Sequence, residues 1–251
     1  MLSLIAAALL WMTQVPAHAA SVFRDDFTTK DGLLANEYAY RHPNADGAVK
    51  SLNWETTSGS LFASGGAGWT GLPDDRSPDK DSSHGTHSAI FRLTTVRSDF
   101  RDVAVEFKLR NQGLSFTRST PAVNWDGIHV FLRYQSPCSL YYASVNRRDD
   151  KVVIKKKIPG GPSNGGTYFS LTSELAHKVP YRKWQRVRAE IRDTPQGSVR
   201  IALYADNVLL AKAVDDGSVG GPPIQNPGKV GLRGDNANFK FSGFTATPLA
   251  P

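Results

Sequence analysis

Apolar residues at every second position between residues 103 and 110 constrain the fold more than any other feature of this chain. Val103, Val105, Phe107 and Leu109 alternate there with Ala104, Glu106, Lys108 and Arg110. A period of two places neighbouring side chains on opposite faces, which is typical of a strand with one buried face. The same pattern recurs at 128–132, 187–191 and 199–203. The chain therefore contains several half-buried strands.

Glycine, proline, asparagine and aspartate cluster between the alternating runs, at 159–162, 193–197 and 220–223. These residue types favour turns. A long segment with the 3.6-residue period of a helix is missing, although 171–178 could form one helical turn. Many short strands separated by turns predict an all-β protein, folded as a two-sheet antiparallel jelly-roll sandwich. Strand-like runs at 23–27 and 239–246 predict that the two ends pair in one sheet.

The first nineteen residues have the pattern of a secretory signal. An apolar run from Leu4 to Met12 is too short to span a membrane, and Ala17-His18-Ala19 places small residues where signal peptidase reads them. No Lys or Arg precedes the run. We expect residues 1–19 to be a signal peptide, residues 20–251 to be one domain, and the protein to be secreted and not bound to a membrane.

A formal net charge of +7 favours acidic partners, such as polyuronates, sulfated glycans, nucleic acid or cell-wall polymers. The run Lys155-Lys156-Lys157 lies inside a strand pattern with no recognised nucleic-acid module around it, so we expect no nucleic-acid partner. Cys138 is the only cysteine, which excludes an internal disulfide and a cysteine metal cage.

Several segments together resemble the concanavalin A-like lectin/glucanase superfamily, and are similar to laminin G-like and 3-keto-disaccharide hydrolase-type domains. They are Asp25-Asp26-Phe27, the "W-x-x-x-x-G-x-L" pattern from Trp54 to Leu61, the "D-F-x-D-x-x-x-x-F" pattern from Asp99 to Phe107, the strand Trp184–Ile191 before a hairpin near Asp206-Asn207, and Gly228–Arg233. The resemblance implies two curved sheets, with sugar received on the concave one.

The same resemblance implies a structural calcium ion in some members, near the chain ends. Asp25 or Asp26 could supply a ligand, but the family's acidic partner in the last strand is absent, since residues 241–244 read Phe-Ser-Gly-Phe. In the alternative interpretation these aspartates cap a turn. We expect no other cofactor to be required.

Alternation applied to 125–135 places four chemically useful side chains on the face opposite the core. They are His129, Phe131, Arg133 and Gln135, joined by comparable polar rows at Tyr142, Ser144, Asn146 and Arg148, at Lys155 and Lys157, and at Arg186, Arg188, Glu190 and Arg192. Arginine and lysine bind carboxylate or sulfate groups, and tyrosine rings pack against sugars. The alternative is a solvated polar face.

We therefore predict a catalytic set and a substrate-binding set on one basic concave face. The catalytic set is His129, Tyr142, Arg133 and Gln135, and the substrate-binding set is Arg92, Asn146, Arg148, Lys155, Lys157, Arg188, Trp69 and Trp125. His84 and His87 are interpreted as loop residues, because spacing supplies no third metal ligand.

Glycoside hydrolysis needs two carboxylates beside the bond, and the glucanase-type "E-x-D-x-x-E" strand is missing. β-Elimination on a uronate polymer needs a cation, a base and an acid, which the basic face offers. The predicted function is a secreted polysaccharide lyase acting on an acidic glycan. Two alternatives remain: a noncatalytic carbohydrate-binding module, and a glycoside hydrolase of the 3-keto-disaccharide type.

Overall fold

The computed structural model describes residues 21–28, 31–75 and 89–250. The predicted signal peptide, residues 1–19, and the two loop histidines, His84 and His87, lie outside the described residues. No helix in the described part of the chain is long and apolar enough to cross a membrane.

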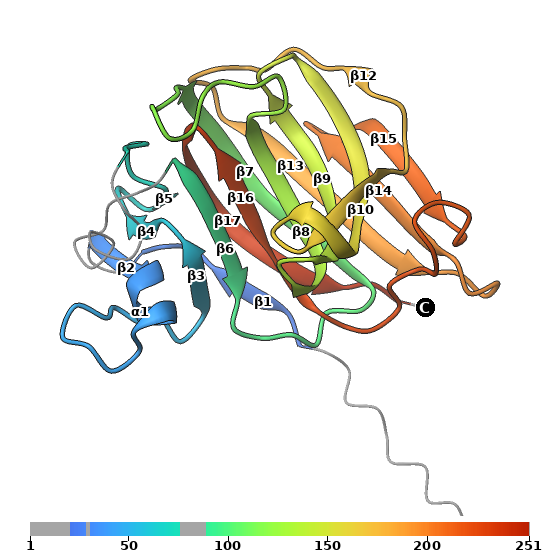
Figure 1. Ribbon diagram of the computed structural model, residues 1–251, viewed down its shortest axis with the longest axis horizontal. Coiled ribbons are helices and arrows are strands. Elements are labelled where there is room, and N and C mark those ends of the chain that lie inside the picture. The colour runs from blue at the N-terminus through green and yellow to red at the C-terminus, as the bar shows by residue number, and fades with distance from the viewer. Residues whose placement is uncertain (1–20, 29–30, 76–88, 251) are drawn as a thin grey trace, which may run out of the picture.

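Two antiparallel sheets form the molecule (Figure 1). The nine-stranded sheet has the order β15-β14-β13-β7-β17-β5-β4-β2, with β1 paired to β17. Its strands are β1 (Phe23–Asp25), β2 (Gly32–Asn36), β4 (Ser60–Ala63), β5 (Gly68–Trp69), β7 (Val103–Leu114), β13 (Gln185–Asp193), β14 (Val199–Ala205), β15 (Val208–Asp215) and β17 (Ala237–Pro248).

The eight-stranded sheet has the order β11-β10-β9-β8-β16-β6-β3, with β12 paired to β10. Its strands are β3 (Trp54–Ser58), β6 (Ile90–Thr95), β8 (Gly127–Ser136), β9 (Ser139–Arg147), β10 (Lys151–Ser163), β11 (Gly166–Ser170), β12 (Leu175–Ala176) and β16 (Lys229–Asp235). The predicted two-sheet antiparallel jelly-roll sandwich is confirmed.

The core lies between the sheets and is built from the inward half of each alternating run. Val105, Phe107 and Leu109 of β7 are all buried, as are Val187 and Ile191 of β13. Side chains of this kind stabilise a fold by about 1.5–3 kcal/mol each when buried. The alternation in the sequence therefore reports the inner face of the sandwich correctly.

The two ends of the chain meet in the nine-stranded sheet, as predicted. Phe23 of β1 lies opposite Ala246 of β17. The Phe23 ring then packs edge-on against Trp54, with 5.2 Å between ring centroids, and Phe244 packs against the same indole at 4.9 Å. The first and last strands are thus fixed by one aromatic cluster.

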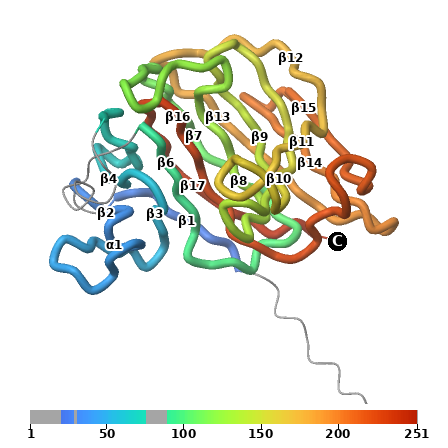
Figure 2. The backbone as a smooth tube through the Cα atoms, viewed as in Figure 1, coloured from blue at the N-terminus to red at the C-terminus, as the bar shows by residue number. Residues whose placement is uncertain are grey.

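One helix, α1 (Glu37–Arg41), lies beside β2 and β3, and with β2–β5 it forms one end of the molecule (Figure 2). Asn36 caps it, because the Asn36 side chain accepts a hydrogen bond from Ala39 N at 3.0 Å. The helical turn expected at 171–178 is wrong: that segment contains the short strand β12, which pairs with Lys151 and Val152 of β10.

Candidate functional site

The outer face of the eight-stranded sheet, turned away from the core, carries two rows of side chains that cross the strands. Directly opposed residues in neighbouring strands share a face. One row runs through Arg92, Arg233, His129 and Ser144, and the other through Glu55, Thr94, Gly231, Phe131, Tyr142 and Lys155. The rows bring three cations and Tyr142, from four strands, onto one surface.

This face is concave. Tyr168 of β11 and Arg233 of β16 are four strand steps apart, which in a flat sheet would be about 19 Å. The Tyr168 hydroxyl nevertheless accepts a hydrogen bond from Arg233 Nη1 at 3.0 Å. The two side chains can meet only because the sheet curls β10 and β11 over its own face. The concave face predicted from the sequence is therefore present.

A pocket of about 510 Å³ opens on this face, and we call it the tyrosine pocket. The Trp125 side chain at its rim is 57% exposed, which leaves an aromatic surface available to a ligand. The pocket is lined by Trp125, Tyr142, Lys155, Pro162, Ser163, Asn164, Tyr168, Arg233 and Asp235.

Arg233 and Asp235 form a fork-like ion pair at the floor of the tyrosine pocket. Arg233 Nε donates to Asp235 Oδ2 and Arg233 Nη2 donates to Asp235 Oδ1, both at 2.8 Å. Burial acts to raise the pKa of Asp235, but the Arg233 charge and His129 hold that pKa well below its ordinary range. The Asp235 carboxylate is therefore ionised and already bound, so it is unsuited to act as a general acid.

His129 lies beneath the pocket rather than in it. The side chain is 1% exposed, with Nδ1 3.0 Å from Ser144 Oγ and Nε2 3.3 Å from Asp235 Oδ2. Burial lowers the pKa of His129, although Asp235 opposes the shift. The imidazole is therefore neutral at neutral pH, and its ring supports Tyr142 at a centroid distance of 4.6 Å. His129 is on the face predicted for it, but its side chain is too deeply buried to contact a ligand.

Tyr142 and Tyr168 line the pocket with their rings 5.4 Å apart. Burial raises the pKa of Tyr142 to about 12, so its phenol keeps its proton. Lys157 Nζ lies 4.7 Å from the centroid of the Tyr168 ring and donates to Pro137 O at 2.6 Å. Burial, with the charges of Arg233 and Arg92, lowers the pKa of Lys157 to about 8. Lys157 thus adds positive charge while supporting the Tyr168 ring.

Two cations on the concave face have no protein partner among the residues that the structure describes. The side chains of Arg92, opposite Arg233, and Lys155, opposite Tyr142, make no hydrogen bond or ion pair with any of the described residues. Burial and the neighbouring Arg233 lower the pKa of Arg92, and burial lowers that of Lys155. Half-buried charges without a counter-ion are costly, so an anionic ligand would stabilise both.

Arg133, predicted to be catalytic, does not lie on the concave face. Strand β8 is irregular between Leu132 and Ser136, and Arg133 adopts a positive φ of 44°. Its fully buried guanidinium donates to Asp102 and Asp193 at the end of the nine-stranded sheet. The prediction is wrong because this bulge turns the side chain away from His129.

Gln135, also predicted to be catalytic, lies outside the tyrosine pocket, as Arg133 does. Its amide Nε2 donates to Pro227 O at 2.7 Å and to Asn226 O at 3.1 Å. The side chain therefore ties the end of β8 to the loop before β16, and its predicted place beside His129 is wrong.

Asn146 and Arg148, predicted to bind substrate, are displaced by a second bulge, between Ile128 and His129. Asn146 lies opposite the core residue Ile128, and Arg148 pairs with Asp126 at 3.0 Å beyond the end of β9. Arg147, which the sequence interpretation missed, lies on the concave side in their place. Its charge accordingly helps to lower the pKa of both His129 and Lys155.

Arg188 and Trp69, also predicted to bind substrate, belong to the other sheet. Arg188 on β13 pairs with Glu190 at 2.7 Å and with Glu106 at 3.3 Å. Trp69 on β5 donates from Nε1 to Asn238 Oδ1 at 2.8 Å. Both predictions are wrong in placement, because alternation finds an outward face but not the sheet to which it belongs.

Of the remaining predicted residues, Arg92, Tyr142, Lys155, Lys157 and Trp125 lie on the concave face or at its rim. Besides Arg147, the sequence interpretation missed three residues of the tyrosine pocket: Arg233, Asp235 and Tyr168. Arg233 and Asp235 alternate outward on β16, a two-residue spacing that the sequence does contain, whereas no local signal marks Tyr168 on β11.

The middle lysine of the run 155–157 points the opposite way from its neighbours. Lys156 is fully buried between the sheets, where its Nζ lies 2.9 Å from Asp215. The hydroxyl of Tyr141 donates to the same carboxylate at 2.5 Å. The run is therefore divided between the core and the concave face and does not form one exposed basic stripe.

The two aspartates that the resemblance implies as calcium ligands both have protein partners, and calcium binding stays a prediction. Asp25 accepts hydrogen bonds from Phe27 N at 2.9 Å and from Trp54 Nε1 at 2.7 Å, and Asp26 pairs with Arg24 at 2.7 Å. Among the described residues, no group of three His, Cys, Asp or Glu side chains could hold a metal ion. Asp25 instead closes a turn and anchors the core tryptophan.

Comparison with known proteins shows the fold. No protein-family profile matches the chain, and no curated protein matches it. A Bacillus subtilis protein of unknown function with a galectin-like fold is 13% identical, with a TM-score of 0.52 over 86% of this chain and 96% of that one. A structure from work on endo-acting O-glycanases, which prominent members of the human gut microbiota express to initiate mucin breakdown, is 9% identical, with a TM-score of 0.54 over 91% and 99%.

The metal-free carbohydrate recognition domain of Emp46p is 10% identical, with a TM-score of 0.51 over 91% of this chain and 100% of that one. The chain therefore has the concanavalin A-like jelly-roll fold, as its sequence segments predicted. Such a fold carries many activities, so the function has to be argued from the site.

Proposed function

We propose that this protein binds an acidic polysaccharide on the concave face of its eight-stranded sheet. The observation that carries the proposal is the pair of half-buried cations, Arg92 and Lys155, that have no acceptor among the described residues. Among the described residues that line the tyrosine pocket, the one carboxylate is that of Asp235, which Arg233 already neutralises. The face therefore has an excess of positive charge that uronate carboxylates or sulfate esters would balance.

The aromatic side chains indicate that the acidic groups of the ligand are carried by a saccharide. Tyr142 and Tyr168 line the tyrosine pocket and Trp125 is exposed at its rim, so flat apolar surfaces lie beside the cations. Pyranose rings pack against such surfaces with their C–H groups. The Emp46p carbohydrate recognition domain and the mucin O-glycanase structure share the fold, which supports a sugar ligand by analogy. Secretion remains a prediction from residues 1–19.

Binding to alginate, glucuronan, pectate and hyaluronan, measured by isothermal titration calorimetry, tests the proposal. We expect at least one of these polymers to bind, and Arg92→Ala or Lys155→Ala to weaken that binding about tenfold, or about 1.4 kcal/mol. Lys212→Ala is the control, because Lys212 is an exposed lysine on β15 of the other sheet. Equal affinities for all three variants and the wild type would refute the proposal.

A second candidate function, cleavage of the same glycan by β-elimination, is favoured by the surroundings of Tyr168. Arg233 donates a hydrogen bond to the Tyr168 hydroxyl oxygen, which fixes that oxygen in the tyrosine pocket as the candidate base. In the elimination, the Tyr168 oxygen in its deprotonated form would take the C5 proton of a uronate whose carboxylate Lys155 neutralises. The electron pair forms the C4–C5 double bond, the C4–O bond breaks, and Tyr142 gives its proton to the leaving oxygen.

Absorbance of the unsaturated uronate product distinguishes a lyase from a binding module. A lyase gives a rise in absorbance that Tyr168→Phe abolishes while calorimetric affinity stays within about twofold, since the ring remains in place. Binding without a rise in absorbance would indicate a noncatalytic carbohydrate-binding module. The third alternative, a hydrolase, is disfavoured because Asp235 is the single carboxylate among the described residues that line the tyrosine pocket, and its pKa is held low.

A further inference from the structure

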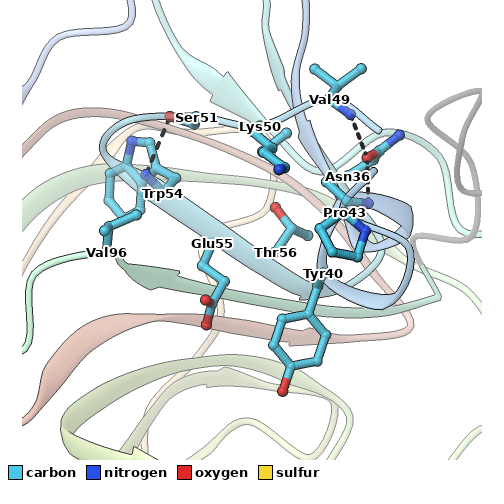
Figure 3. Close-up of a pocket in the computed structure, with 12 residues that line it drawn as sticks. Asn36, Tyr40, Pro43, Val49, Lys50, Ser51, Trp54, Glu55, Thr56 and Val96 are labelled. Atoms are coloured by element: carbon cyan, nitrogen blue, oxygen red, sulfur yellow. Dashed lines mark hydrogen bonds between the residues drawn. The ribbon is translucent and has the colours of Figure 1, made fainter. Parts of the chain in front are cut away.

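A second pocket, of about 310 Å³, lies at the free edge of β3 beneath α1, and we call it the helix pocket (Figure 3). It is lined by Ala35, Asn36, Ala39, Tyr40, Pro43, Val49, Lys50, Ser51, Trp54, Glu55, Thr56 and Val96. No residue of this list lines the tyrosine pocket.

Register and side-chain contacts connect the helix pocket to the concave face. Glu55 lies opposite Thr94, at the end of the row that begins with Lys155, so its side chain shares the face of the tyrosine pocket. Glu55 Oε1 also accepts a hydrogen bond from Lys229 Nζ at 2.7 Å, across β6. Strand β3 is two strand steps from β16, or about 10 Å. The two pockets are therefore neighbours on one surface.

Tyr134 and Arg92 lie between the two pockets. The Tyr134 phenol is within electrostatic reach of Arg92 and also of Tyr40 and Glu55, which line the helix pocket. With Phe131 and Tyr142, Tyr134 belongs to an apolar cluster on the concave face. A glycan chain that extends from the tyrosine pocket toward β3 would therefore pass the Tyr134 ring and the unpaired Arg92 side chain.

The helix pocket has side chains suited to a saccharide unit. The hydroxyl of Thr56 is buried, with its residue 2% exposed, and has no hydrogen-bond partner among the described residues. Tyr40 is 52% exposed, and Figure 3 shows its ring and the Glu55 carboxylate extending to the same side of β3. Thr56 lies opposite the core residue Leu93, so it points to the other side of β3 from Glu55. At this free strand edge, a sugar hydroxyl entering beneath α1 could satisfy Thr56, others could donate to Glu55, and the Tyr40 ring could stack on the sugar.

We propose that the helix pocket is a distal subsite for the same glycan, so that the ligand is a polymer segment running from the tyrosine pocket across Arg92 to Tyr40 and Thr56. This inference rests on the proposed function. It adds that a short oligosaccharide fills only the tyrosine pocket, whereas a longer one gains the contacts of the helix pocket.

Calorimetry with matched disaccharides and decasaccharides of alginate, glucuronan, pectate and hyaluronan tests this inference. We expect one decasaccharide to bind the wild type at least about tenfold more tightly than its disaccharide. Tyr40→Ala and the isosteric Thr56→Val should remove that advantage and leave disaccharide affinity unchanged. Tyr181→Ala, at an exposed tyrosine outside both pockets, is the control, and circular dichroism checks that each variant folds.

Two results would overturn the inference, and they differ in what else they overturn. If a decasaccharide binds in an Arg92-dependent way but Tyr40→Ala and Thr56→Val retain its full affinity, the helix pocket is not a subsite and the proposed function stands. If no oligosaccharide binds the wild type, the proposed function and the subsite both fail.

Discussion

The Asp235 carboxylate is buried between Arg233 and His129, so the position of each of these groups depends on the other two. Arg233 in turn donates to Tyr168, and His129 supports the ring of Tyr142. The two tyrosines that face the ligand are therefore positioned by one buried carboxylate.

Asp235→Asn should destabilise the protein by about 3–5 kcal/mol, because it leaves a largely buried guanidinium without its counter-charge. Urea unfolding followed by fluorescence measures this change. Glu190→Gln, which breaks a partly exposed pair with Arg188, should cost less than about 1 kcal/mol. A loss at Asp235 no larger than that at Glu190 would contradict the role given to the buried pair.

His129 makes stability depend on pH in a defined direction. Its pKa in the folded state lies below the ordinary value of about 6.5, so the unfolded chain binds more protons as the pH falls below that value. The free energy of unfolding should therefore decrease between about pH 7 and about pH 5.

His129→Gln should have a flatter profile than the wild type over that range, as measured by urea unfolding at several pH values. His177, whose pKa burial also lowers, is the control: His177→Gln should leave the His129 contribution in place. Asp235, with a depressed pKa, loses its contribution only below about pH 4, so the two effects separate. Identical slopes for wild type and His129→Gln would count against a buried neutral imidazole.

At the scale of strands, β8 shows what alternation can and cannot predict. The period of two identified the strand and placed Ile128, Val130 and Leu132 correctly in the core. It failed at Arg133 and Asn146, because bulges near both ends of the β8–β9 pair reverse the faces. A bulge depends on how two strands pair, which the sequence of either strand alone does not reveal.

Gly127, beside the bulge between Ile128 and His129, should tolerate no side chain. Its φ is +146°, and an added Cβ would lie 2.0 Å from the carbonyl oxygen of Asn146. We expect Gly127→Ala to lower the melting temperature and to destabilise the fold by more than about 1 kcal/mol. Gly113→Ala, at a φ of +155° with nothing within 4 Å of the added Cβ, isolates the backbone strain. Equal losses at both glycines would show that the close approach is unimportant.

At the scale of the whole molecule, the sequence predicted the sandwich and the pairing of its ends, because these follow from alternation and turns. The positive charge of the face followed from its arginines and lysines, and its concavity was implied by the resemblance to the concanavalin A-like superfamily. It missed the contact between Tyr168 and Arg233, since these residues lie far apart in the sequence and meet only when the sheet curls. The helix pocket was missed for a similar reason: α1 is five residues long and has no detectable period. Local sequence patterns therefore predict the two sheets, whereas the pockets depend on the curvature of the eight-stranded sheet and on short elements such as α1.

The net charge of +7 implies that ionic strength controls binding of an acidic glycan. Raising NaCl from about 0.05 M to about 0.5 M should weaken that binding by about tenfold or more, because salt screens the cations of the face. The double variant Arg92→Ala with Lys155→Ala should have a shallower dependence on salt than Lys212→Ala. Affinity that does not change with salt in the wild type would argue for a neutral ligand.

The location of the bound glycan shows most directly whether the concave face is the binding surface. An NMR titration of the ¹⁵N-labelled protein with an acidic oligosaccharide should shift the backbone amides of Tyr142, Lys155, Tyr168 and Arg233, which surround the tyrosine pocket. Amides of Arg192, Arg200 and Lys212, on the outer face of the nine-stranded sheet, should stay in place. Shifts centred on those three residues, with none around the tyrosine pocket, would show that the glycan does not bind on the concave face.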